Sequence, residues 1–203
     1  MHFCVSFHLS SPTALKRKFR MLILVFLLLG GGYFSYQGLK IEIKARVAQI
    51  LLHYAWHNSL EKGEPVKPWP SFDGSPVLKL EIPKYNISQI VLSSTSGQSL
   101  AYGPGFHNET FLPYTNKTTV ISSHRDSHGL YIKKLKKGDI IKIQDVDDTW
   151  YHYSVDDFTI LNVNENNNLS NINGLLLITC YPFDAITSGT PLRFIVTAKK
   201  IKL

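Results

Sequence analysis

The chain has 203 residues, of which 44% are hydrophobic and 12% aromatic, which is enough to bury one good core and too little for two. The formal net charge of +7 would suggest a nucleic-acid partner, but the positive charges are unevenly distributed along the chain. Four positive charges gather between Lys16 and Arg20, and the remaining 18 basic and 15 acidic residues leave only +3. Those bases form no long stripe interleaved with aromatic residues, so we exclude nucleic acid as the main partner.

The N-terminal part predicts a membrane anchor. Residues 1–20 form a basic, cytoplasmic tail, and residues 21–38 are an uncharged apolar run that follows directly, as in a signal peptide or a signal anchor. The run is shorter than the ~20 residues that a bilayer requires, but Gln37-Gly38-Leu39 can extend it into the interface. No convincing A-x-A cleavage site follows it, so we favour an uncleaved anchor with the C-terminal domain outside. If Met21 is the true start, the four bases before the anchor are absent.

An amphipathic helix is predicted over residues 39–60, continuing from the membrane. Apolar residues recur there at near-helical period, with neither Gly nor Pro after Gly38. These residues are Ile43, Val47, Ile50, Leu51, Tyr54 and Leu60.

Residues 61–75 are rich in Pro, Gly and charge and predict a linker, which leads into a single domain over residues 76–203. Short strand-like runs separated by turns fill that domain, with one short helical candidate at Leu130–Leu135. Such spacing indicates a mainly antiparallel sandwich or barrel. The expected strands are Val77–Ile82, Ile87–Leu92, Thr118–Ser122, Ile140–Gln144, Trp150–Val155, Thr159–Val163, Leu175–Thr179 and Leu192–Ala198.

Two residues near the C-terminus point to a reactive site. Cys180 ends an apolar strand and is followed at once by Tyr181-Pro182, so we expect its thiol to be accessible at the end of the strand. The alternative is that Cys180 is a small hydrophobic residue buried in the core. The other cysteine, Cys4, lies across the apolar segment, so no disulfide is expected between the two. Arg193 lies inside the next apolar strand, where a guanidinium requires an anionic partner or a substrate.

A cysteine nucleophile needs a base or a cationic neighbour, because a free thiol with a pKa of ~8.5 is mostly protonated at neutral pH. His124 is the best candidate, since it follows a predicted strand and begins a polar turn, a placement that mirrors Cys180. His128 is the runner-up, while His107 lies in a turn region and His152 within a strand.

Metal binding is the alternative use of these histidines. His124 and His128 form a His-x-Asp-x-His sequence, and His53 and His57 stand four apart on the predicted helix. Neither pair has further ligands at suitable spacing, so no metal or other cofactor is expected.

These features together resemble the sortase pattern of cysteine transpeptidases, and most closely the class GN sortases of marine, Gram-negative proteobacteria. The resemblance runs from about residue 36 to the C-terminus. Its motifs are Gln37-Gly38-Leu39, Ala48-Gln49, Val66 to Pro70, Tyr102 to Gly105, His124 to His128, Thr179 to Ile186 and Pro191 to Arg193.

The resemblance implies an eight-stranded β-barrel preceded by a transmembrane and amphipathic helix, with catalytic roles for His124, Cys180 and Arg193. Thr179 is assigned to substrate binding, although strand alternation points it to the face opposite Cys180, where it would support the site from behind. Two departures from the family pattern are Leu176 in place of a threonine, and Ser122-Ser123 in place of Ala-Gly before the histidine.

The implied activity is that of a cysteine peptidase and transpeptidase in the cell (inner) membrane, with its catalytic domain in the periplasm. It would cleave an LPxTG-like signal on a secreted or surface protein through a thioester and transfer the product to an amine, whose identity the sequence leaves open. Two alternatives remain: a cysteine endopeptidase that uses water as acceptor, and a non-catalytic, membrane-anchored β-domain.

Overall fold

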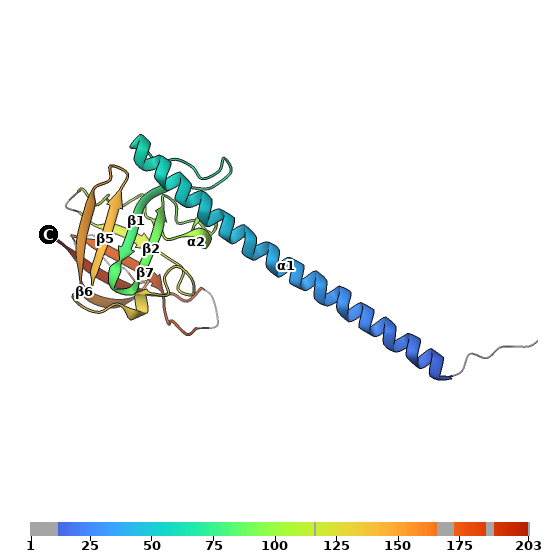
Figure 1. Ribbon diagram of the computed structural model, residues 1–203. Coiled ribbons are helices and arrows are strands. Elements are labelled where there is room, and N and C mark those ends of the chain that lie inside the picture. Colours follow the sequence, from blue (N-terminus) through green and yellow to red (C-terminus); the bar gives the residue numbers. More distant parts are fainter. Residues whose placement is uncertain (1–11, 116, 166–172, 186–188, 203) are drawn as a thin grey trace, which may run out of the picture. The chain divides into compact units, whose positions relative to one another are not determined.

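The computed structural model describes residues 12–115, 117–165, 173–185 and 189–202. Cys4 lies outside these ranges. The chain forms two units, one ending at Arg46 and the other beginning at Val47, and each is described by itself. Helix α1 (Pro12–Lys62) contributes residues to both (Figure 1).

The first unit is the N-terminal part of α1. Its apolar side chains from Met21 to Tyr36 are solvent-exposed, including Phe26, which is 78% exposed. The helix is long and apolar enough over Lys16–Lys62 to be a candidate membrane span, a test of length and composition that signal sequences also pass.

The second unit is a closed β-barrel with the strand order β1-β2-β3-β4-β7-β8-β6-β5, which confirms the expected fold class (Figure 1). Most neighbouring strands are antiparallel, but β2 pairs with β3, and β4 with β7, in parallel. The strands are β1 (Pro76–Ile82), β2 (Ile87–Leu92), β3 (Gly105–Phe106), β4 (Thr119–Ser122), β5 (Ile140–Asp145), β6 (Trp150–Asn162), β7 (Leu175–Cys180) and β8 (Leu192–Ile201). The connections contain a short helix α2 (Gly97–Tyr102) and two 3-10 turns, η1 (Pro83–Tyr85) and η2 (Ile132–Lys134).

Two strand predictions differ from the structure. The expected strands Trp150–Val155 and Thr159–Val163 are one strand, β6, because a shift of register between Val155 and Asp157 keeps the intervening residues in the ladder against β8. Strand β3 has only two residues and gives no periodic signal. The helical candidate Leu130–Leu135 is only the single turn η2.

The barrel interior follows strand alternation. Leu78, Leu80 and Ile82 of β1 are fully buried, while the residues between them are partly exposed. Gly174 directly precedes β7, and a Cβ atom there would lie 2.3 Å from the carbonyl oxygen of Ala198, so only glycine allows the close approach to β8.

A second cluster packs the C-terminal part of α1 against the barrel. Leu52 and Trp56 meet Phe72, Ile90 and Leu92, all 5% exposed or less. The expected linker therefore contributes Phe72 to the core.

The buried face of α1 is also not the expected one. The residues expected on the apolar face are largely exposed, and a neighbouring stripe of both small and large side chains packs against the barrel instead. That stripe consists of Ala48, Leu52, Ala55, Trp56 and Ser59.

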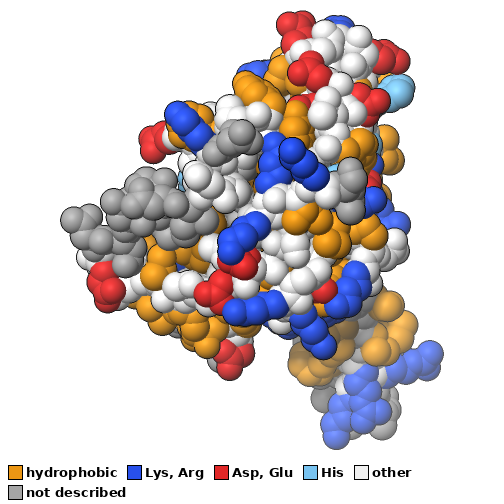
Figure 2. All heavy atoms as spheres, turned by 90° about the vertical axis from the view of Figure 1, so that its left-hand side faces the viewer, with side chains coloured by type: hydrophobic (Ala, Val, Ile, Leu, Met, Phe, Trp, Pro, Cys, Tyr) orange, Lys and Arg blue, Asp and Glu red, His pale blue; other side chains and the backbone are white. Residues whose placement is uncertain are grey.

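Charges on the barrel surface are paired locally. Lys137 lies 2.8 Å from Asp157, and Lys199 lies 2.9 Å from Asp156. Figure 2 shows basic and acidic side chains intermixed on one face. Exposed pairs of this kind contribute little to stability.

Candidate active site

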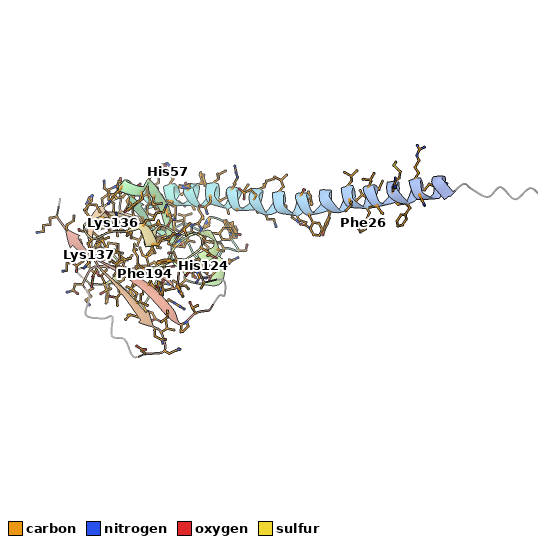
Figure 3. All side chains as sticks on the ribbon, turned by 90° about the horizontal axis from the view of Figure 1, so that it is seen from below. Phe26, His57, His124, Lys136, Lys137 and Phe194 are labelled. Carbon is orange, nitrogen blue, oxygen red and sulfur yellow. The ribbon has the colours of Figure 1, made fainter. Side chains whose placement is uncertain are left out.

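The parallel pairing of β4 and β7 places the ends of these two strands side by side. Ser122 is in register with Ile178, and the amide of Ser123 donates to the carbonyl oxygen of Ile178 at 3.0 Å. His124 (labelled in Figure 3) lies two residues after Ser122, just beyond the end of β4, and Cys180 lies two residues after Ile178, at the end of β7. Neighbouring strands lie about 4.8 Å apart, so the structure brings the histidine and the cysteine to the same edge.

Antiparallel pairing of β7 with β8 places Arg193 directly opposite Cys180. Side chains of directly opposed residues share a face, with Cβ atoms about 4.5–5.5 Å apart. Cys180 is a partly exposed free thiol. One guanidinium nitrogen of Arg193 donates to the carbonyl oxygens of Thr190 at 2.5 Å and Leu192 at 3.0 Å, which holds the side chain at the start of its own strand.

A groove of about 300 Å³ lies on the outer face of these strands. Its wall is mixed, with four aliphatic side chains and five polar or charged ones. The aliphatic residues are Leu161, Val163, Ile178 and Ile195, and the others are His107, Ser122, Asn162, Glu165 and Arg193. Ile178 and Cys180 project from the same face of β7, so the groove lies on the face that carries the thiol, although Cys180 itself does not line it.

Thr179 lies on the other face of β7. Its side chain is 2% exposed, and its hydroxyl donates to the carbonyl oxygen of Ser123 at 2.9 Å. That carbonyl belongs to the peptide group that joins Ser123 to His124. The burial of Thr179 favours a role in supporting the histidine from behind, and its assignment to substrate binding stays a prediction.

The turn after His124 is compact. The amide of Gly129 donates to the carbonyl oxygen of His124 at 2.7 Å. A Cβ atom on Gly129 would lie 2.6 Å from the Ser123 hydroxyl oxygen and 2.8 Å from the His124 carbonyl oxygen. Only glycine therefore fits where this turn folds back against the histidine.

The other histidines occupy different positions. His107 lies in the groove, 2.7 Å from the Ser122 hydroxyl; burial lowers its pKa, and the opposing effect of Glu109 is smaller. His152 pairs with Ile201, at the far end of β8 from Arg193, about 26 Å away at 3.3 Å per residue. His152 is thus remote from the thiol, and His107 is hydrogen-bonded to Ser122, whereas His124 follows the end of the strand that pairs with β7.

His128 is near His124. Burial lowers the pKa of His128; a hydrogen bond with the backbone of Ala101 acts in the opposite direction, and the charge of His124 lowers it further. Across the described ranges, no group of three or more His, Cys, Asp or Glu side chains is arranged to hold a metal ion.

Sequence reasoning missed two contributors to this region. Ser122 entered as the end of an expected strand and as a departure from a family pattern, and only the pairing of β4 with β7 places it beside Ile178, on the face of Cys180. Arg125, next to His124, donates from its guanidinium to the carbonyl oxygens of Pro182 and Ala185, both at 2.7 Å. No local sequence pattern predicts a contact between segments that lie so far apart in the chain.

A thiol, an imidazole and a guanidinium at the adjoining ends of three neighbouring strands, beside a partly apolar groove, are the groups that cysteine-dependent acyl transfer requires. The family model described as "Sortase domain" matches residues 80–201, and the chain belongs to the sortase family.

Among curated proteins, the chain is similar to Sortase D of Bacillus subtilis (strain 168), with 29% identity over 136 residues, which are 60% of this chain and 62% of that protein. The match thus spans less than two thirds of that relative. Among solved structures, the fold is similar to Sortase A from Corynebacterium diphtheriae (TM-score 0.57, 21% identity, 66% of this chain and 64% of that one). It is also similar to sortase C-1 from Actinomyces oris (TM-score 0.56, 25% identity, 63% of this chain and 74% of that one).

Proposed function

We propose that this protein is a membrane-anchored cysteine transpeptidase. It cleaves an LPxTG-like sorting signal on a secreted or surface protein and transfers the new carboxyl end to an amine. The observation that carries the proposal is the pairing of β7 with both of its neighbours. Ile178 lies opposite Ser122 of β4, and Cys180 lies opposite Arg193 of β8. This arrangement gathers His124, Cys180 and Arg193 at one edge of the barrel.

Each group has a distinct role in the proposed reaction. The Cys180 thiolate attacks the carbonyl carbon of the scissile peptide bond, and the C–N bond breaks to leave a thioester on sulfur. His124 gives a proton to the leaving amine, then takes one from the incoming amine as that amine attacks the thioester and releases the thiolate. Arg193 donors stabilise the substrate carbonyl or the developing oxyanion.

A peptide-cleavage assay with and without an added amine tests the reaction. We expect an amide product when the amine is present, with hydrolysis as the slower side reaction. Cys180→Ala removes the nucleophile and little packing, so its turnover should be undetectable while the fold is retained. Residual activity above about a tenth of wild type would exclude Cys180 as nucleophile, since a true nucleophile contributes orders of magnitude.

Two alternatives give different outcomes. An endopeptidase would release the same acid product whether or not amine is added. A non-catalytic β-domain would have a thiol that resists alkylation and would cleave no peptide.

In the membrane part of the proposal, residues 21–38 form an uncleaved, single-pass anchor in the inner membrane, and the barrel lies in the periplasm. This topology is the one that the resemblance to class GN sortases implies. It is supported by the exposed apolar stretch of α1 and by the bases before it. Anchoring would raise the effective concentration of emerging substrates at the site. In cells with a permeabilised outer membrane, an impermeant thiol reagent should label Cys180 and spare Cys4. Labelling of Cys4 alone would show the opposite topology, with the N-terminus and not the barrel in the periplasm.

A further inference from the structure

Arg125 connects the two loops that present the proposed catalytic pair. It directly follows His124, and it donates from its two terminal nitrogens to Pro182 and Ala185, two and five residues beyond Cys180. Both distances are 2.7 Å, at the short end of the range for hydrogen bonds from a charged donor. A planar guanidinium is suited to such a double contact because its donors have a fixed fork geometry.

The loop after Cys180 is anchored independently of Arg125. The amide of Tyr181 donates to the carbonyl oxygen of Leu192 at 3.0 Å, and the hydroxyl of Thr190 donates to the carbonyl oxygen of Tyr181 at 2.7 Å. The ring of Phe183 packs on that of Phe194 with centroids 5.1 Å apart; Phe194 is labelled in Figure 3. Tyr181, Phe183 and Thr190 are therefore held against the barrel, and another segment can be tied to this part of the chain.

The segment at His124 has left the regular ladder. The last backbone bond between β4 and β7 is the one from Ser123 to Ile178, and the next residues form a turn. The Thr179 hydroxyl holds this segment from the barrel side. Arg125, on the other side of His124 in the sequence, ties the same segment to Pro182 and Ala185 in the loop after Cys180.

We propose that Arg125 is a positioning residue that sets the approach of the His124 imidazole to the Cys180 thiol. The inference rests on the proposed function, in which this pair performs the proton transfers. Arg125 acts through its hydrogen bonds to the backbone carbonyl oxygens of Pro182 and Ala185. Misplacement of a catalytic group by about 1 Å can cost roughly 100-fold in rate, so loss of the tie should reduce catalysis more than substrate binding.

The test is a double-mutant cycle read by iodoacetamide alkylation of Cys180 at pH 7, in the full chain with Cys4→Ser as background. The four proteins are the background, Arg125→Ala, His124→Ala and the double variant. If Arg125 acts through His124, Arg125→Ala slows alkylation about as much as His124→Ala, and the double variant is no slower than His124→Ala. No effect of Arg125→Ala, or effects that multiply in the double variant, would overturn the proposal.

Arg125→Lys distinguishes the contribution of the two hydrogen bonds of Arg125 from that of its positive charge. Arg125→Lys keeps the positive charge but cannot reach both carbonyls with a rigid fork, so its alkylation rate should stay well below wild type. A wild-type rate would mean that charge alone matters and would overturn the proposal. Should Arg125→Ala fail to fold, Arg125→Lys takes its place in the cycle.

Peptide turnover supplies the second readout. We expect kcat of Arg125→Ala to fall at least about tenfold while KM stays within about twofold, the pattern of a lost transition-state interaction. A rise in KM alone would instead make Arg125 a substrate contact and overturn the positioning role. The control is Arg46→Ala, because Arg46 is 77% exposed and pairs only with Glu42 of its own helix in the contacts of the described chain, at 3.0 Å; it should match wild type. Because alkylation requires no peptide, the cycle decides on Arg125 even if Cys180→Ala retains turnover and the proposed function falls.

Discussion

Replacing Thr179 by valine tests how the barrel holds the histidine segment. Valine keeps the shape of the side chain and removes the hydroxyl that donates to Ser123 at 2.9 Å. Position 179 is 2% exposed, so water cannot easily replace the lost donor. The carbonyl oxygen concerned belongs to the peptide group next to His124, so the substitution acts at the base of the catalytic turn.

The expected cost combines a lost hydrogen bond with the desolvation of its acceptor. Such a change destabilises by about 2 kcal/mol. For a domain of this size, that loss corresponds to a decrease in Tm of roughly 4–8 °C. Because the histidine segment also loses its inner support, kcat should fall about tenfold, equivalent to about 1.4 kcal/mol in the barrier.

Thr179→Ser is the matched control. Serine retains the hydroxyl and loses one methyl group, at about 1 kcal/mol or less, so it should keep most of the turnover. The assays are thermal unfolding by circular dichroism and the kinetics of peptide cleavage. If Thr179→Val has wild-type stability and only a raised KM, Thr179 contacts substrate and the supporting role is wrong.

Three further predictions address the stability of the barrel and the chemistry of the site. Burial raises the pKa of Asp139, but Lys84 at 2.6 Å, the Lys136 amide and Tyr85 outweigh it and lower that pKa. The carboxylate therefore stabilises the fold above its unfolded pKa of ~3.9 and loses this effect as pH falls through its lower folded value. Asp139→Asn should cost about 2 kcal/mol in urea unfolding at pH 7 and much less near pH 2; an equal cost at both would contradict the assignment. Gly129→Ala should lower both Tm and turnover, because its Cβ atom would lie 2.8 Å from the His124 carbonyl oxygen; wild-type values would show that the turn adapts. Arg193→Lys keeps the charge and loses the planar fork, so most turnover should disappear in the peptide assay, whereas near-normal turnover would show that charge suffices.

Local patterns in the sequence determined most of the strands. Ile87–Leu92 was predicted to the residue, and the position of Cys180 at the end of its strand followed from an apolar run and the turn after it. Alternation also placed Thr179 and Cys180 on opposite faces. These features depend on neighbours within a few residues, which is why periodicity alone could reveal them.

Tertiary structure alone decided which strand ends meet. No local signal states that β4 runs parallel to β7 in the register that pairs Ser122 with Ile178, or that Arg125 reaches the loop beyond Cys180. The same holds for α1, where Leu52 and not Ile50 faces the barrel. An apolar side chain shows that a face can be buried, but the surface that covers it comes from a distant segment, because strand pairing and packing are selected by the free energy of the whole barrel.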